Sequence, residues 1–233
     1  MKIHIVGGNE AIKAMFAEEN HEIVNDPKEA ELLQFTGGAD VSPILYGQPS
    51  HSTTFSDISR DEKELEIYAE AIKRKDPPIL AGICRGAQFL HVMNGGTLFQ
   101  DVKGHATART HTAWFQTPGS RQIRGFQVTS THHQMMKNDS KEDHEVLGHA
   151  NVVADSITDY DAKNDKFVKE GGSELRKRGT FDEMECLYYP STRSLCFQPH
   201  PEYVGKNHSC RGFYFELLDK IANEKRTESC ADL

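Results

Sequence analysis

The chain has 233 residues, of which 37% are hydrophobic, and its formal net charge at pH 7 is −8. This length provides one sizeable core and is typical of a single α/β domain, which we expect over residues 1–233. The acidic balance argues against sequence-independent nucleic-acid binding, and no apolar run approaches the roughly 18 residues that span a bilayer.

The N-terminal segment and the cysteines indicate the compartment. The segment "MKIHIVGGNEAIKAMF" lacks the layout of a signal peptide, so we expect a cytoplasmic location. The five cysteines are odd in number and form no C-x-x-C pair, which argues against a disulfide scaffold and a thiolate zinc site. The twelve histidines show no recognisable ligand spacing, so neither a metal site nor a cofactor is predicted.

The first third of the chain alternates between predicted strands and helices. "KIHIV" (2–6) reads as a strand, "NEAIKAMFAEE" (9–19) as a helix, and "ELLQFT" (31–36) as a strand that ends at Gly37-Gly38. A long loop rich in Pro, Ser and Gly follows over residues 38–57. This order favours an α/β fold.

A second helix is predicted after the long loop. Ser59 and Glu62 have the spacing of a capping box. The apolar positions that recur at helical spacing and predict its buried face are Leu65, Tyr68, Ala69 and Ile72. A short buried strand, "PPILAGI" (77–83), comes next, and the helix-forming stretch "RGAQFLHVMN" begins at residue 85.

The second half of the chain is predicted to be richer in strands. The runs with strand character are "FQVTS" (126–130), "ANVVA" (150–154), "MECLYY" (184–189) and "SLCFQ" (194–198). A last helix is marked by apolar residues at helical spacing, namely Tyr214, Leu217, Leu218 and Ile221. The pattern predicts a mainly parallel central sheet flanked by helices on both faces. Residues 161–179 are charged and nearly free of large apolar residues, so we interpret them as a surface insertion.

Cys84 lies at the junction between a predicted strand and a predicted helix. Residues 82–86, "GICRG", have the G-x-nucleophile-x-G form of a nucleophile elbow. The flanking glycines remove side chains that would clash in so sharp a turn. The positive end of the helix dipole would stabilise a thiolate there, and the N–H of Arg85 would be free to bind an oxyanion. Cys186 and Cys196 lie in strand-like runs and are interpreted as small buried hydrophobes.

A histidine and a carboxylate lie together near the end of the last predicted strand. In "CFQPHPEY" (196–203), Pro199 and Pro201 cannot donate to a sheet ladder, so the strand must end there. His200 and Glu202 are two residues apart and project to the same side of an extended chain. They could form a His–Glu pair that serves a cysteine nucleophile, or they could be ordinary residues of a surface loop.

Several ordered motifs resemble those of the class I glutamine amidotransferase superfamily. They are "FTGGADVSP" (35–43), "RDEKELE" (60–66), "GICRGAQ" (82–88), "GGTLFQDV" (95–102), "STHHQ" (130–134) and "QPHPE" (198–202). The set is most similar to the γ-glutamyl hydrolase branch, which includes γ-glutamyl-γ-aminobutyrate hydrolases. The resemblance implies a flavodoxin-like fold with the nucleophile elbow after a central strand.

The resemblance implies a role for each residue that matches a motif. Cys84 is similar to the nucleophile, His200 to the general base and acid, and Glu202 to the group that orients the histidine. The backbone N–H groups of Gly37, Gly38 and Arg85 resemble the oxyanion hole. Substrate contacts are implied for Gln88, His133 and Gln134. The short N-terminal part and the 161–179 segment depart from the family pattern, which leaves the substrate open.

Four functions compete at this point. The first is a hydrolase of γ-glutamyl amides that acts through a thioester, and the second is a glutaminase subunit that delivers ammonia to a separate synthetase. The third, an α/β-hydrolase, is disfavoured because there the acid precedes the histidine, whereas Glu202 follows His200. The fourth is a non-catalytic binding protein on the same fold. The sequence leaves the oligomeric state, including a homo-oligomer, and the amine leaving group open.

Overall fold

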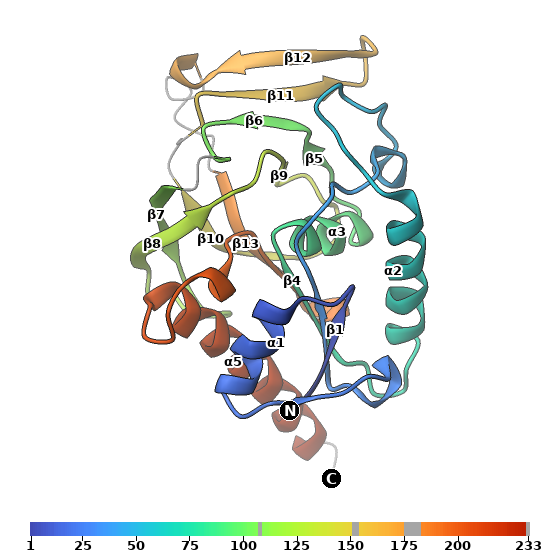
Figure 1. Cartoon of the computed structure of the whole chain (residues 1–233), viewed down its shortest axis with the longest axis vertical. Coiled ribbons are helices and arrows are strands. Elements are labelled where there is room, and N and C mark those ends of the chain that lie inside the picture. The colour runs from blue at the N-terminus through green and yellow to red at the C-terminus, as the bar shows by residue number, and fades with distance from the viewer. Residues whose placement is uncertain (107–108, 151–153, 175–182, 232–233) are drawn as a thin grey trace.

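The computed structural model describes residues 1–106, 109–150, 154–174 and 183–231 of the chain, and the side chains of residues 225–231 are outside the description. Within the described residues, nine strands form one central sheet in the order β2-β1-β3-β4-β14-β13-β10-β7-β8 (Figure 1). No helix in these ranges combines the length and apolar character needed to cross a membrane.

The half of the central sheet from β2 to β14 is parallel. It is formed by β1 (Lys2–Val6), β2 (Glu22–Ile23), β3 (Leu32–Phe35), β4 (Ile79–Ile83) and β14 (Ser194–Phe197). The three inner strands, β3, β4 and β14, are short and buried throughout, as expected where helices cover both faces of a parallel sheet. The fold class predicted from the sequence is confirmed.

The other half of the central sheet is antiparallel. It continues from β14 through β13 (Glu183–Tyr189), β10 (Glu145–Ala150), β7 (Arg109–Phe115) and β8 (Arg124–Ser130). The runs predicted as strands at 126–130, 184–189 and 194–198 lie in or overlap β8, β13 and β14. Of the run predicted at 150–154, residues 151–153 lie outside the described residues, while β7 and most of β10 were not predicted.

Helices cover the two faces of the sheet and bury two separate hydrophobic clusters. Helices α1 (Glu10–Glu18) and α5 (Ser209–Ala231) pack on one face, and α2 (Ile58–Ala71) and α3 (Arg85–Met93) pack on the other (Figure 1). Successive side chains of β14 point to opposite faces of the sheet, so the strand contributes to both clusters. Leu195 and Phe197 pack on the α5 side, and Cys196 packs on the α3 side. The apolar face predicted for the last helix is confirmed, because all four of its residues are fully buried.

The predicted start of α2 was wrong, and of its predicted buried face Tyr68 is buried but Leu65 and Ile72 are exposed. The helix is capped by Asp57, whose carboxylate accepts from the N–H groups of Ser59 and Arg60, so Ser59 lies inside the first turn. Leu65 and Ile72 are 38% and 41% exposed, respectively. The buried side of the helix carries Asp61, Glu64, Tyr68 and Ala71. Hydrophobic periodicity failed here because two carboxylates occupy buried positions.

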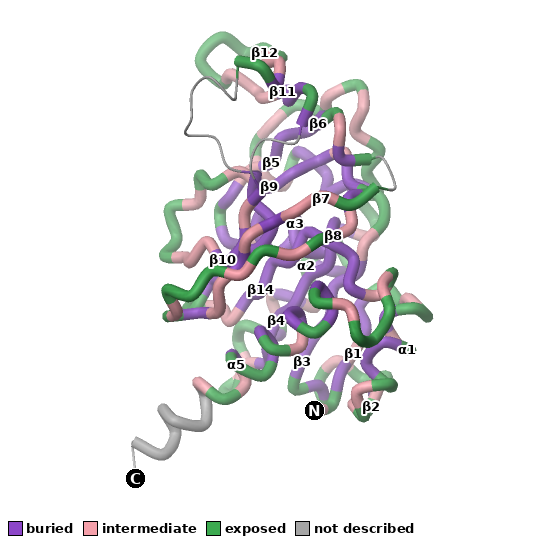
Figure 2. Tube along the Cα trace, turned by 90° about the vertical axis from the view of Figure 1, so that its left-hand side faces the viewer, coloured by how far each residue is buried: buried purple, intermediate pink, exposed green. Residues whose placement is uncertain are grey.

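Two small sheets lie beyond one end of the central sheet. In one, β6 (Asp101–Lys103) pairs with β11 (Ser156–Asp161), which forms a hairpin with β12 (Lys166–Gly171), and in the other β5 (Leu98–Phe99) pairs with β9 (Met135–Met136). Figure 2 shows β12 as exposed and intermediate residues, whereas β6 is mostly buried. Of the segment predicted as an insertion, residues 161–171 lie in this hairpin, residues 172–174 follow it in helical conformation, and residues 175–179 lie outside the described residues. Its assignment as an insertion stays a prediction.

Candidate active site

Cys84 occupies a strained turn between β4 and α3. Its backbone has φ 52° and ψ −109°, a conformation that a residue other than glycine adopts only at a cost of about 1–3 kcal/mol. A Cβ at Gly82 would overlap the backbone of Gly86, and a Cβ at Gly86 would overlap the carbonyl of Phe35. The two glycines therefore let strand and helix approach closely enough to hold this turn.

His200 lies beyond the end of β14, the strand next to β4. Its backbone N–H donates to Thr129 Oγ1 over 2.7 Å, and its ring stacks on Tyr203 at a centroid separation of 4.4 Å. His200 Nδ1 lies 2.7 Å from Glu202 Oε1. The sequence predicted this pair in an extended segment, but residues Pro201–Tyr203 form a 3-10 turn. The turn, rather than an extended chain, brings the carboxylate under the imidazole.

The side chains of Cys84 and His200 both lie against the turn at Gly37. A Cβ on Gly37 would lie 3.0 Å from His200 Cε1 and 3.7 Å from Cys84 Cβ, so the bare backbone of Gly37 lies against both side chains. Burial alone would lower the pKa of His200, but its hydrogen bonds to Cys84 and Glu202 outweigh burial and raise that pKa above 6.5. A carboxylate-paired imidazole beside a thiol is the arrangement that activates a cysteine.

Arg60 holds the Gly37-Gly38 turn. Its guanidinium donates to the carbonyls of Gly37 and Thr36 over 3.1 and 2.9 Å. Gly38 has φ 134°, and a Cβ there would overlap Arg60 Nη1. A glycine at position 38 is therefore favoured by its backbone conformation, and any larger side chain there would also displace the guanidinium of Arg60.

A buried ionic network links this turn to the elbow. Arg60 Nε donates to Glu64 Oε1 over 2.8 Å, and the guanidinium of Arg85 donates to both Glu64 and Asp61. Asp61 in turn accepts from the N–H of Ser42 over 2.9 Å. Two arginines thus face two carboxylates, and together they connect the residue after Cys84 to the loop after β3.

The residues with implied substrate contacts make hydrogen bonds within the protein. Gln88 Nε2 donates to the backbone carbonyl of Gln134 over 2.9 Å and to Gln198 Oε1 over 3.1 Å. The side chain of Gln134 donates to Thr54 Oγ1 over 3.1 Å, and His133 Nε2 lies 3.0 Å from Asp40 Oδ1. The side-chain contact of Asp40 raises the pKa of His133 against the opposing effect of burial.

Sequence reasoning missed the residues that support the catalytic candidates. Thr129 and Tyr203 contact His200 from β8 and from the turn after β14, and no local pattern marks either of them. A signal did exist for Arg60 and Glu64, because residues four apart on a helix interact across one turn.

The remaining described cysteines differ from Cys84 in their surroundings. Cys186, Cys196 and Cys210 are free and buried, and burial raises the pKa of each thiol. Only the backbone of Cys230 is described. Among the described thiols, Cys84 alone has a hydrogen bond to an imidazole in addition to a strained turn.

Comparison with known proteins adds relatives in sequence. The family model of Peptidase C26 matches residues 12–165. A glutamine amidotransferase-like protein of Lactococcus lactis subsp. cremoris, the YvdE homologue, is 32% identical over 124 residues, 46% of this chain and 63% of that protein. YvdE of L. lactis subsp. lactis is 33% identical over 124 residues, which cover 50% of its length. The match thus spans between half and two-thirds of these curated relatives.

Solved structures are similar across nearly the whole fold. A GMP synthase-type protein from Thermoplasma acidophilum superposes with a TM-score of 0.56 at 16% identity, covering 98% of both chains. A glutamine amidotransferase from Thermotoga maritima gives 0.54 at 14% identity, over 97% of this chain and 85% of that one. PurLQS from T. maritima gives 0.51 at 16% identity, over 94% and 98%. At these identities the similarity shows a shared fold.

Proposed function

The chain belongs to the Peptidase C26 family, within the class I glutamine amidotransferase-like superfamily, and from this premise we propose that it is a cysteine hydrolase of γ-glutamyl amide bonds. One observation carries the proposal. Cys84, in a strained elbow between two sterically required glycines, lies beside an imidazole that a carboxylate orients at 2.7 Å. Buried structural cysteines have neither feature.

In the first half of the proposed reaction, the Cys84 sulfur attacks the γ-carbonyl carbon of the substrate. A tetrahedral oxyanion forms, and the C–N bond then breaks to leave a thioester on Cys84. His200 protonates the departing amine, while Glu202 keeps the imidazole in the tautomer that faces the thiol. The raised pKa of His200 supports this role, because an imidazolium is then available at neutral pH.

The oxyanion is proposed to bind backbone N–H groups of Gly37, Gly38 and Arg85. Arg85 is the first residue of α3, so its N–H has no acceptor within the helix and lies at the positive end of the helix dipole. The Arg60 contacts to the Gly37 and Thr36 carbonyls support a fixed geometry at the other half of the hole. A hole of this kind stabilises the transition state most when its donors are fixed beforehand.

In the second half of the reaction, His200 takes a proton from water while the water oxygen attacks the thioester carbon. The C–S bond then breaks, glutamate leaves with a free γ-carboxylate, and Cys84 and His200 return to their starting state with the proton that His200 took up. Gln88, His133 and Gln134 are proposed to contact the substrate. Gln88 and Gln134 are linked by a hydrogen bond, so they would act as one wall of the pocket.

A release assay tests the proposal. Purified protein is incubated with γ-glutamyl amines, γ-glutamyl peptides, glutamine and poly-γ-glutamate, and the released amine or ammonia is measured. We expect release from at least one γ-glutamyl substrate and none from the Cys84→Ala protein. Equal release by wild-type and Cys84→Ala proteins would reject the covalent mechanism, and no release by the wild type from any of these substrates would reject the substrate class.

A glutaminase subunit that serves a synthetase is the second candidate. The observation that favours it is structural similarity to PurLQS and to a protein whose name refers to GMP synthase. Such a subunit would hydrolyse glutamine preferentially and faster in the presence of its synthetase. Glutamine turnover that rises on adding a co-purifying synthetase would favour this candidate, whereas preference for a substituted γ-glutamyl amine without any partner would favour the hydrolase. A non-catalytic binding protein would bind γ-glutamyl compounds and release nothing.

A further inference from the structure

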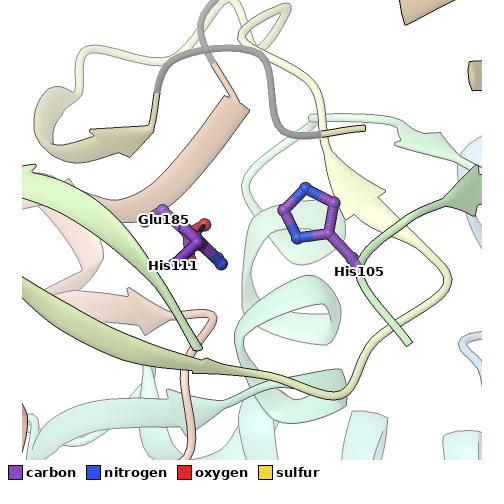
Figure 3. A group of neighbouring side chains, drawn as sticks. All are labelled: His105, His111 and Glu185. Carbon is purple, nitrogen blue, oxygen red and sulfur yellow. Dashed lines mark hydrogen bonds and ion pairs between the residues drawn. The ribbon is translucent and has the colours of Figure 1, made fainter. Parts of the chain in front are cut away.

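A second group of ionisable side chains lies outside the Cys84–His200 pair. His105 follows β6, His111 lies in β7 and Glu185 in β13. One ligand atom from each of the three lies within 4.8 Å of the others. Figure 3 shows the His105 imidazole on one side of the group, with His111 and Glu185 on the other. His105 and Glu185 are buried, and the side chain of His111 is only 8% exposed.

The group contains hydrogen-bond acceptors that lack donors. His111 Nε2 lies 2.6 Å from Glu185 Oε1, yet Glu185 Oε2 is buried without a partner among the described residues. His132, whose ring lies 4.5 Å from that of His105, contacts the Gln134 carbonyl through Nδ1 at 2.8 Å. That contact requires the proton on Nδ1 and leaves Nε2 as an acceptor, which is also buried and unpartnered in the same set of residues. Buried acceptors without donors are costly unless a cation or a water satisfies them.

A second carboxylate orients His105. Glu183 Oε2 lies 2.7 Å from His105 Nε2, so Nδ1 is the nitrogen left to face the group. A carboxylate behind a histidine is the usual support of a metal-binding imidazole. The hydroxyl of Ser130 lies 3.0 Å from His105 Nδ1 and 2.7 Å from the His105 carbonyl, so its hydrogen can turn to the carbonyl when Nδ1 binds a cation.

We propose that His105, His111 and Glu185 bind a divalent transition-metal ion of the zinc type. Two imidazoles and one carboxylate form a common protein ligand set for zinc, with water in the fourth position. A cation would also supply a partner for the buried Glu185 Oε2, which has none among the described residues. The contact between His111 and Glu185 has to widen, because ligands of a tetrahedral zinc ion lie about 3.3 Å apart at bond lengths of about 2.0 Å.

The metal site would support the strand that holds His200. Ser130, which contacts His105, follows Thr129 in β8, and Thr129 accepts the N–H of His200. Sequence spacing could not indicate this site, because His105 and His111 lie on either side of the start of β7 and Glu185 comes from β13. No metal site was predicted for that reason.

The test uses full-length Cys84→Ala protein, because Cys84 and His200 could otherwise bind zinc themselves. The protein is stripped with a chelator, titrated with Co²⁺ and Zn²⁺, and analysed for bound metal after dialysis. We expect one Zn²⁺ per chain, a visible Co²⁺ spectrum of low coordination number that Zn²⁺ abolishes, and a higher unfolding temperature with Zn²⁺. Glu185→Gln in this background, which keeps the side-chain volume, should weaken Zn²⁺ binding at least about 100-fold, and Glu183→Gln about 10- to 100-fold.

The matched control is Glu202→Gln in the same Cys84→Ala background, which changes another His-paired carboxylate and should leave the Zn²⁺ affinity within about twofold. Far-UV circular dichroism checks that each variant is folded. If the parent protein retains no Zn²⁺ and gives no such Co²⁺ spectrum, the proposal is wrong. It is equally wrong if folded Glu185→Gln protein binds Zn²⁺ as tightly as its parent, because the metal is then elsewhere. Should Glu185→Gln fail to fold, Glu183→Gln supplies the same comparison.

Discussion

Replacing Arg85 with methionine should strongly destabilise the protein. Arg85 is 2% exposed, and its guanidinium is shared between Asp61 and Glu64, which are 0% and 2% exposed. In Arg85→Met protein, Arg60 still reaches Glu64, but Asp61 keeps only the N–H of Ser42 among these contacts. Removing one partner of a buried ion pair leaves an uncompensated charge and costs about 3–5 kcal/mol. The free energy of unfolding should fall by that amount.

Arg124→Met is the matched control. Arg124 also forms two bonds to a carboxylate, at 2.8 and 2.9 Å from Glu216, but this pair is 41% and 47% exposed. Both arginines also lie over a phenylalanine ring, with the guanidinium carbon of Arg85 5.1 Å from the centroid of Phe89 and that of Arg124 4.8 Å from Phe213. Burial is therefore the main difference. An exposed pair contributes about 0–1 kcal/mol and an exposed cation–π contact about 0.5–1 kcal/mol, so the control should lose at most about 2 kcal/mol.

Urea unfolding measures the difference, followed by far-UV circular dichroism and by the fluorescence of the single tryptophan, Trp114. For a chain of this size, a loss of 3–5 kcal/mol corresponds to a fall in Tm of about 6–20 °C. Arg85→Lys keeps the charge but not the fork that reaches two carboxylates, so it should fall between wild type and Arg85→Met. If Arg85→Met loses no more stability than Arg124→Met, the buried network does not stabilise the elbow and the reasoning fails.

Three further predictions concern the chemistry and the hairpin. Cys84→Ala should lower kcat/KM by about 10⁴ or more while the circular dichroism stays unchanged, and iodoacetamide should label Cys84 before Cys196; preferential labelling of Cys196 would contradict this. The raised pKa of His200 keeps the imidazolium above pH 6.5, so kcat/KM should be bell-shaped in pH, and its alkaline limb should move to lower pH in Glu202→Gln and be lost in His200→Gln. Near-wild-type turnover in His200→Gln would remove this residue from the mechanism. Amide hydrogens of β12 should exchange faster than those of β4, since β12 is a partly exposed edge strand, and equal protection would contradict this.

Local patterns predicted those parts of the fold that depend on local contacts. The strands over residues 2–6 and 79–83 and the buried face of α5 were found because apolar runs and helical spacing reflect burial directly. The turn at Cys84 was predicted because the G-x-C-x-G pattern places glycines where a larger side chain would clash in a sharp turn. The catalytic roles were suggested by these local patterns, were reinforced by resemblance to a family, and stay predictions.

Other features could not be predicted because they depend on contacts between residues that are far apart in the sequence. Asp61 and Glu64 face inward since Arg85, from α3, neutralises them, and a count of apolar positions along α2 contains no such information. Thr129 became a partner of His200 through the packing of β8 beside the end of β14. The His105, His111 and Glu185 group likewise depends on how three separate elements meet.

The register between β4 and β14 also affects when the site can form during folding. Ile83 pairs with Phe197, and the N–H of Cys84 donates to the Phe197 carbonyl, so the thiol and the segment with His200 are held by one pairing between strands about 110 residues apart in the chain. Closing a loop of that length costs about 4 kcal/mol of chain entropy before the pairing returns any contact energy. Contacts of such long range are slow to form, so the chain should acquire its secondary structure well before it acquires a reactive thiol.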